Sequence, residues 1–110
     1  MVHVTKDFIV VIVTTKDRVE AEKISRALLE MHLIVCANIL GEVASCFFWQ
    51  GKIEAADECL ILMKTRRSLF TEVAQKVKEL HSYEVPEIIA LPIVEGSANY
   101  LAWLKDTLKT

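Results

Sequence analysis

The sequence predicts an α+β fold in which strands and helices follow in the order βαββαβ, with one further helix at the end. Three observations support this prediction. A continuous β-branched run, Phe8 to Thr14, opens the chain. Two stretches, at residues 19–31 and 69–80, repeat apolar residues at helical spacing. Between these stretches lie two long strand-like runs, separated by a glycine that is typical of a hairpin turn.

The first strand and the first helix are predicted from residue 8 to about residue 32. The run FIVVIVT at Phe8 to Thr14 is apolar at successive positions, which is typical of a central strand buried on both faces. Asp17 and Glu20 then form a D-x-x-E capping box, a pattern that starts a helix. Apolar residues recur at helical spacing from Val19 onwards, so we expect this helix to extend to about residue 32.

The next segment predicts a strand that is too long to lie straight inside a small domain. It runs from residue 34 to residue 50 and is interrupted at Gly41-Glu42. A fully extended strand of this length would span about 55 Å. We therefore expect a bend or a β-bulge near Gly41, or a strand that projects outward.

A β-hairpin turn is predicted at Gly51 and Lys52, after which residues 53–65 run back as the partner strand. A type II′ turn fits, because Gly accepts its first position at little cost. Phe47, Phe48 and Trp49 place large apolar groups on both faces of this hairpin, since side chains alternate along a strand. One small domain can cover only one of these faces, so the hairpin tip predicts a partner.

The second half of the chain predicts a helix, a strand and a closing helix. Ser68 can cap the helix, and its apolar stripe runs from Leu69 to Leu80. Residues 88–94 read as a strand that Pro92 limits to a sheet edge or a strand end. Residues 98–108 close the chain as a short helix with leucines on one side.

The element order βαββαβ is that of the ferredoxin-like, split βαβ fold with a four-stranded antiparallel sheet. Right-handed crossovers place both long helices on the same face of this sheet. The first strand and the run CLILM at residues 59–63 are apolar at successive positions, so the other face also needs cover. Together with the aromatic hairpin, this predicts association with further copies of the same chain.

Length and composition predict a single domain over residues 1–110. Hydrophobic residues make up 53% of the chain, and the formal net charge is -2. A weakly acidic chain with scattered cations does not suit a nucleic-acid-binding role, because such proteins neutralise phosphates. The polar start of the chain has neither a signal peptide nor a membrane-spanning run, so we expect a cytoplasmic protein with no membrane partner.

The chain has three cysteines, Cys36, Cys46 and Cys59, and no C-x-x-C spacing. With a turn at Gly51-Lys52, Cys46 and Cys59 would be diagonal neighbours about 7–8 Å apart. This distance is long for a disulfide, so we expect reduced thiols.

The segment HSYEVPE, from His81 to Glu87, is the main candidate site. It could bind a divalent metal through His81 and a carboxylate, or it could hold only a helix end and a turn. Glu58 lies among apolar residues of a strand, where a carboxylate should meet a Lys, an Arg or a metal. Lys64, at the end of that strand, could receive an anion or lie in a solvated turn.

No pattern in the sequence indicates an enzyme. The chain has no glycine-rich phosphate loop, no G-x-S-x-G and no H-E-x-x-H. A nucleophile pair of Cys36 and His81 stays open on composition, although apolar neighbours should raise the pKa of the thiol and reduce its reactivity.

The motifs in this chain resemble the CutA family of divalent-cation tolerance proteins over nearly all of residues 8–108. Single motifs are weak, but five in the same order and spacing make the match specific. They are Cys36-Ala37-Asn38-Ile39, Trp49-x-Gly51-Lys52-Ile53-Glu54, Lys64-Thr65, His81-x-Tyr83-x-x-Pro86-Glu87-Ile88 and Tyr100-Leu101-x-Trp103.

This resemblance implies a ferredoxin-like fold, a homotrimer built by the long hairpins, and a role in the response to copper and other divalent metals. Some relatives are credited with copper ligation by a first-strand Cys and by two adjacent His. The matching positions here hold Val13 and Leu80, so only His81 remains. One His is too few for a tight site, so a metal would need Cys36, Glu58, Glu87 or a neighbouring chain.

The resemblance thus implies three sets of residues and one alternative function. Copper or another divalent cation is the expected ligand, no cofactor is required, and the alternative is a trimeric sensor like the PII signalling proteins that binds a small anionic metabolite in clefts between subunits. The metal candidates are His81, Cys36 and Glu87. The cleft candidates are Trp49, Glu58, Lys64 and Tyr83. The candidates for the trimer interface are Phe48, Trp49, Gly51, Lys52, Tyr100 and Trp103.

Overall fold

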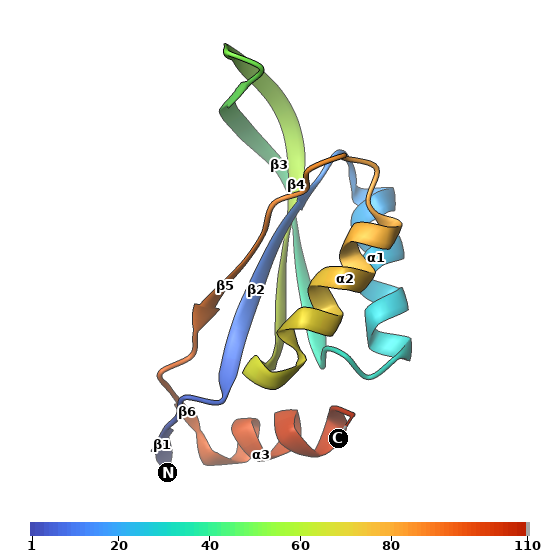
Figure 1. Ribbon diagram of the computed structural model, residues 1–110. Coiled ribbons are helices and arrows are strands. Elements are labelled where there is room, and N and C mark those ends of the chain that lie inside the picture. The colour runs from blue at the N-terminus through green and yellow to red at the C-terminus, as the bar shows by residue number, and fades with distance from the viewer. Residues whose placement is uncertain (110) are drawn as a thin grey trace.

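A four-stranded antiparallel sheet with two helices on one face forms the body of the protein in the computed structural model, which describes residues 1–109 (Figure 1). The strand order is β3-β4-β2-β5. This arrangement confirms the predicted α+β fold, the order βαββαβ and the closing helix. The bounds are β2 Phe8–Thr15, α1 Arg18–Glu30, β3 Cys36–Trp49, β4 Lys52–Arg66, α2 Phe70–Leu80, β5 Ile88–Pro92 and α3 Ala98–Thr107.

The two long helices start in different ways. The Oδ1 atom of Asp17 accepts a hydrogen bond of 2.8 Å from the amide of Glu20, which confirms the predicted cap of α1. The predicted cap of α2 by Ser68 is wrong. Ser68 lies inside a short 3₁₀ turn, Arg67–Leu69, and α2 begins after it with no side-chain cap. The amide of Arg67 instead donates to the carbonyl of Asp7, which ties the turn to the chain before β2.

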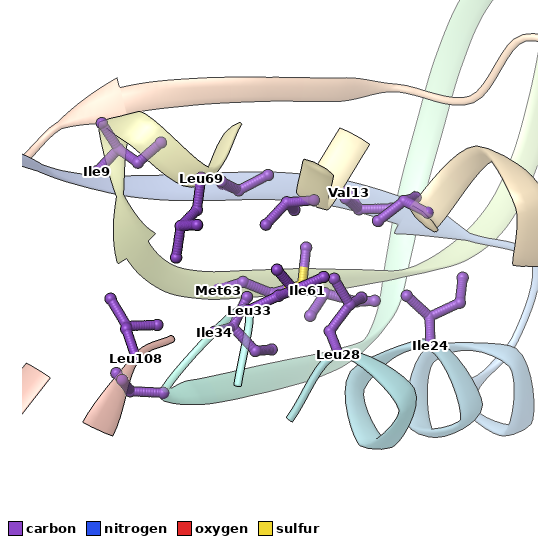
Figure 2. Packing of buried hydrophobic residues seen from close by; sticks show 14 of the residues in the cluster. Ile9, Val13, Ile24, Leu28, Leu33, Ile34, Ile61, Met63, Leu69 and Leu108 are labelled. Carbon is purple, nitrogen blue, oxygen red and sulfur yellow. The ribbon is translucent and has the colours of Figure 1, made fainter. Parts of the chain in front are cut away.

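The hydrophobic core lies between the helices and one face of the sheet, which we call the covered face. Val11 and Val13 of β2 and Ile61 and Met63 of β4 point to this face and are fully buried. Figure 2 shows several of these side chains packed against Ile24 and Leu28 of α1. Successive residues of a strand alternate between faces, so each strand contributes every second residue to this core.

The opposite face of the sheet carries apolar side chains that no helix covers, and we call it the open face. Its members are the even-numbered residues of β2 and β4 and the odd-numbered residues of β5. Ile89 and Leu91 are 50% and 53% exposed. The expectation that this face is also apolar is therefore confirmed. The apolar residues of the open face are Val10, Ile12, Leu40, Leu60, Leu62, Ile89 and Leu91.

Strands β3 and β4 extend beyond the body of the sheet as a projecting hairpin (Figure 1). The molecule consequently measures 47 × 25 × 22 Å. The predicted irregularity at Gly41-Glu42 is confirmed, because the register of β3 against β4 shifts between Leu40 and Val43. Glu42, within this irregular segment, has a φ of 58° and thus adopts the left-handed conformation.

The turn at the hairpin tip lies one residue earlier than predicted. Trp49 pairs with Lys52, and the two central residues, Gln50 and Gly51, have φ values of 50° and 79°. Positive φ at both positions is the signature of a type I′ turn, so the predicted type II′ turn at Gly51-Lys52 is wrong. A type I′ turn matches the twist of the strands, and Gln50 accepts the left-handed conformation at a modest cost.

The shift of the turn also changes the expected placement of the cysteines. Cys46 pairs with Ala55, four residues away from Cys59 along β4, so the two cysteines are not diagonal neighbours. Cys59 is buried in the core and Cys46 is exposed on the hairpin. All three cysteines are free thiols, as expected.

The N-terminal segment forms a small ribbon that the sequence did not predict. Strand β1, Val2–Val4, pairs antiparallel with β6, Glu95–Ser97, just before α3. The start of the chain is thus paired with the segment that precedes α3. Within residues 1–109, none of the helices has both the length and the apolar character needed to cross a membrane.

Candidate functional site

A groove of about 850 Å³ lies where the projecting hairpin leaves the body of the sheet, and we call it the tip groove. Strands β3 and β4 form its floor, and the loop between α2 and β5 forms its wall. Phe47, Trp49 and Tyr83 contribute aromatic surface, and Glu58 and Glu87 contribute carboxylates. This volume is typical of a small-molecule site. Three of the four predicted cleft residues, Trp49, Glu58 and Tyr83, therefore lie together.

Glu58 and Tyr83 form the central polar contact of this groove. The hydroxyl of Tyr83 donates a hydrogen bond of 2.6 Å to Oε2 of Glu58, whose residue is only 7% exposed. Burial raises the pKa of Tyr83, and the hydrogen bond to Glu58 raises it further. Tyr83 thus remains a neutral donor at physiological pH. No Lys, Arg or His within residues 1–109 forms an ion pair with Glu58, so the predicted cation does not come from the same copy.

His81 supports the wall of the tip groove from inside the protein. Its side chain is fully buried. Nε2 lies 2.7 Å from the carbonyl oxygen of Thr14 and therefore donates, whereas Nδ1 accepts a 3.0 Å hydrogen bond from the amide of Tyr83. These two bonds define a neutral imidazole with its proton on Nε2. Both ring nitrogens are thus occupied, so the ring holds β2 and the Tyr83 loop together.

Glu20 anchors the same loop to the start of α1. Its Oε2 accepts a 2.8 Å hydrogen bond from the amide of Ser82, and its Oε1 accepts one of 3.3 Å from the amide of Lys16. Burial favours the neutral form of Glu20, but the hydrogen bonds from Ser82 and Lys16 outweigh it, so the pKa of Glu20 is lowered. This carboxylate, which the sequence suggested only as a helix cap, also positions the groove wall.

The three predicted metal ligands do not lie together in one copy. His81 is buried beside Thr14, and Glu87 is exposed at the tip groove. Cys36 pairs with Lys64, which pairs with Val10, four residues or about 13 Å along β2 from Thr14. Within residues 1–109, no group of three His, Cys, Asp or Glu residues could hold a metal ion. A single copy does not fit copper, and Cys36 is also too far from His81 to form a nucleophile pair.

Lys64 and Cys36 form a second polar group at the far end of the open face. Lys64 donates to the side-chain oxygen of Asn38, an amide that the sequence did not connect to it. The sulfur of Cys36 lies 3.7 Å from the hydroxyl of Tyr100 on α3. Burial and the contact with Cys36 raise the pKa of Tyr100 to about 12. Lys64, the fourth predicted cleft residue, thus lies outside the tip groove of its own copy.

The tip groove has a strongly one-sided charge. Three carboxylates, Glu58, Glu84 and Glu87, line it, and none of the described residues that line it is a Lys, an Arg or a His. A groove of this charge repels anions and attracts cations. Within one copy, the groove thus favours a positively charged group.

The predicted interface residues lie in two exposed clusters. Phe48 is 76% exposed beside Trp49 at the hairpin tip, where Gly51 and Lys52 complete the turn. Tyr100 and Trp103 lie on the exposed side of α3, with ring centroids 5.5 Å apart. Exposed aromatic groups of this size often mark contacts with other chains.

The chain matches the protein-family model described as CutA1 divalent ion tolerance protein over residues 9–107. It is 42% identical to the divalent-cation tolerance protein CutA of Thermus thermophilus over 88% of this chain and 94% of that protein. It is 40% identical to the chloroplastic protein CutA of Arabidopsis thaliana over 92% of this chain, but it spans only 56% of that protein.

Solved structures agree with this similarity. The fold superposes on the divalent cation tolerance protein from Thermus thermophilus with a TM-score of 0.91 at 40% identity, covering 93% of this chain and 99% of that chain. For CutA1 from Oryza sativa the TM-score is 0.91 at 37% identity, covering 96% of each chain.

Proposed function

This chain belongs to the CutA1 divalent ion tolerance family, and from that premise we propose that it is a homotrimeric protein of the response to divalent metal ions. The names of its relatives support the role in metal tolerance. The uncovered apolar surface of the open face supports self-association and is the observation that carries the proposal. We propose no catalytic role and no required cofactor. The cytoplasm stays our proposed location, although relatives bear the names chloroplastic and periplasmic.

Self-association follows from the chemistry of the open face. Leu40, Ile89 and Leu91 are about half exposed although they lie in the body of the sheet. Covering such side chains contributes about 25 cal/mol per Å² of apolar area. A further copy of the same chain is the simplest cover, because most soluble oligomers consist of identical chains.

Sedimentation tests the assembly directly. We expect a particle of about three times the chain mass of 12.5 kDa. A monomer at micromolar concentration would contradict the proposed homotrimer, and with it any site that needs two copies.

Copper or another divalent cation is proposed to bind between copies. Cys36 and Glu87 lie at opposite ends of the sheet, so head-to-tail packing could bring Cys36 of one copy near Glu87 of another. A thiolate suits Cu(I), and a carboxylate adds charge for a divalent ion. His81 is the least available of the three predicted ligands, since binding through either nitrogen breaks a hydrogen bond that holds the Tyr83 loop.

Calorimetric titration of copper into the wild type and single variants tests these ligands. We expect Cys36→Ser and Glu87→Gln to weaken copper binding at least tenfold while the assembly keeps its mass. His81→Ala should lower stability more than copper affinity. Unchanged affinity in both the Cys36 and the Glu87 variants would contradict direct ligation by these residues.

The alternative function, a sensor of a small anionic metabolite, has one observation in its favour. Lys64 has no carboxylate partner within residues 1–109, and the buried Nε of Arg66 has no hydrogen-bond partner there. Both cations lie at the end of the open face away from the tip groove. A nucleotide or metabolite that raises the melting temperature, where copper does not, would favour this alternative.

A further inference from the structure

A second groove, of about 480 Å³, lies between α2 and the start of β5, and we call it the helix groove. Phe70, Ala74 and Lys78 line it from α2, where a spacing of four residues places them in one row along the helix. The apolar residues that complete its lining are Val85, Pro86 and Ile88. A groove of this volume and lining is typical of a small-molecule site.

The helix groove is charged at one end and apolar at the other. Lys78 lies in the last turn of α2, and Glu84 lies in the loop that leaves the same end of the helix. Phe70 is the first residue of α2, about 12 Å away from Lys78 along the helix axis. An elongated molecule with a polar head and an apolar body therefore suits this groove.

The two charged side chains at this end have opposite signs, and neither is neutralised by a nearby charge of its own chain. Lys78 and Glu84 are exposed, and neither forms an ion pair within residues 1–109. Each is thus free to pair with a ligand group of the opposite charge. A head group that carries both a carboxylate and an ammonium satisfies both side chains.

Apolar surface around the helix groove is available for the body of such a ligand. Val85 is 68% exposed, and Phe70 and Ile88 are only partly buried at the edge of the core. Removing these groups from water favours binding. The groove lies beside α2, on the helix side of the sheet, so the proposed contact through the open face leaves it accessible.

We propose that the helix groove binds a free amino acid with a large apolar side chain, such as phenylalanine or leucine. The carboxylate of the ligand pairs with Lys78 and its ammonium pairs with Glu84. Its side chain lies over Ala74 in the direction of Phe70. A simple carboxylate would leave Glu84 without a partner, and a simple amine would do the same to Lys78. The site is formed by one copy, so it does not depend on the proposed assembly.

Calorimetric titration of the wild-type chain with four probes tests the class of ligand. L-phenylalanine should bind. Phenylpropionate lacks the ammonium, phenethylamine lacks the carboxylate and glycine lacks the apolar body, so each should bind at least tenfold more weakly. No binding of L-phenylalanine or L-leucine at millimolar concentration would overturn the proposal, and so would equal binding of any of the other three probes.

Three variants test the location of the site. Lys78→Met and Glu84→Gln each remove one charge from the head-group end and should weaken L-phenylalanine binding at least tenfold. Ala74→Leu fills the floor of the groove and should have the same effect, while circular dichroism shows an intact fold, because Ala74 is only partly buried and leucine is a good helix former.

Matched controls change the same kinds of residue outside the groove. Lys23→Met and Glu30→Gln replace exposed charges of α1 that form no ion pair within residues 1–109, and Gln75→Leu adds a leucine at an exposed position of α2. All three should bind L-phenylalanine as the wild type does. Groove variants that fold and keep the wild-type affinity, or controls that lose it equally, would place the binding elsewhere and overturn the proposal.

Discussion

On the covered face of the sheet, Val11, Val13 and Ile61 are completely buried under two helices, whereas on the open face Ile89 and Leu91 remain about half exposed. Both faces are apolar in sequence, so composition alone does not separate them. The charged residues distinguish the two faces. The covered face has no charged side chain in its central rows, while the open face carries Glu58 and Lys64 at its two ends. The first face thus folds the chain, and the second is suited to a specific contact with another chain.

The largest effect should come from the covered face. Ile61→Ala removes part of a fully buried side chain and leaves a cavity beneath α1, so it should lower the free energy of unfolding by about 2–5 kcal/mol. Urea denaturation followed by circular dichroism measures this loss. Leu62→Ala, one residue along on the open face, is the matched control and should affect association more than the fold. If the two variants lost the same free energy of unfolding and associated equally well, the proposed division of roles between the two faces would be wrong.

The hairpin tip should affect assembly rather than folding. Trp49→Asp places a carboxylate in the proposed apolar contact and should weaken association by several kcal/mol. The fold should remain, because this side chain contributes little to the core of its own copy. Analytical ultracentrifugation over a range of concentrations measures the change. A variant with the wild-type mass would mean that the tip faces solvent.

Tyr83 should have an intermediate effect, because it joins the loop wall to the open face. Tyr83→Phe removes the hydrogen bond to the buried carboxylate of Glu58 and should cost about 1.5–3 kcal/mol. Thermal unfolding at a fixed protein concentration measures this loss. Tyr100→Phe, which removes a weaker contact with a sulfur atom, is a suitable control and should cost less.

The smallest effect is the pH dependence that Glu20 contributes. Its pKa in the folded protein is lowered from 4.5, so its ionised form adds stability above that pH, and this stability is lost as the pH falls below it. The Glu20→Gln variant should therefore lose less free energy of unfolding than the wild type as the pH falls below about 5. Urea unfolding at several pH values measures this difference. An unchanged pH profile would show that Glu20 does not anchor the loop through its charge.

Local patterns in the chain were sufficient to predict the elements and their order. The capping box at Asp17, the stripe of α2 and the irregularity at Gly41-Glu42 each depend on residues close in sequence. The type and position of the turn at Gln50 were predicted wrongly, because the choice between turn types depends on the twist of both strands. A single Gly in the sequence does not indicate that twist. The ribbon of β1 and β6 was missed because its two strands are about 90 residues apart.

The candidate site was predicted less completely than the fold. Trp49, Glu58 and Tyr83 were predicted to share a cleft, and the structure brings them together. Lys64 was placed in the same cleft, but it lies six positions along β4 from Glu58 in one copy. The role of His81 could not be read from its neighbours, because its partners, the Thr14 carbonyl and the Tyr83 amide, are set by backbone geometry.

The sequence by itself determined the α+β architecture, the long hairpin and the apolar character of both sheet faces, because periodicity and turn residues act over a few positions. Only the tertiary structure decided which face the helices cover and which charges remain without a counter-ion. Those properties depend on contacts between distant segments: Tyr83 meets Glu58 across 25 residues, and His81 meets Thr14 across 67. Packing brings these distant segments together and thereby decides which charged groups lie at the two ends of the open face.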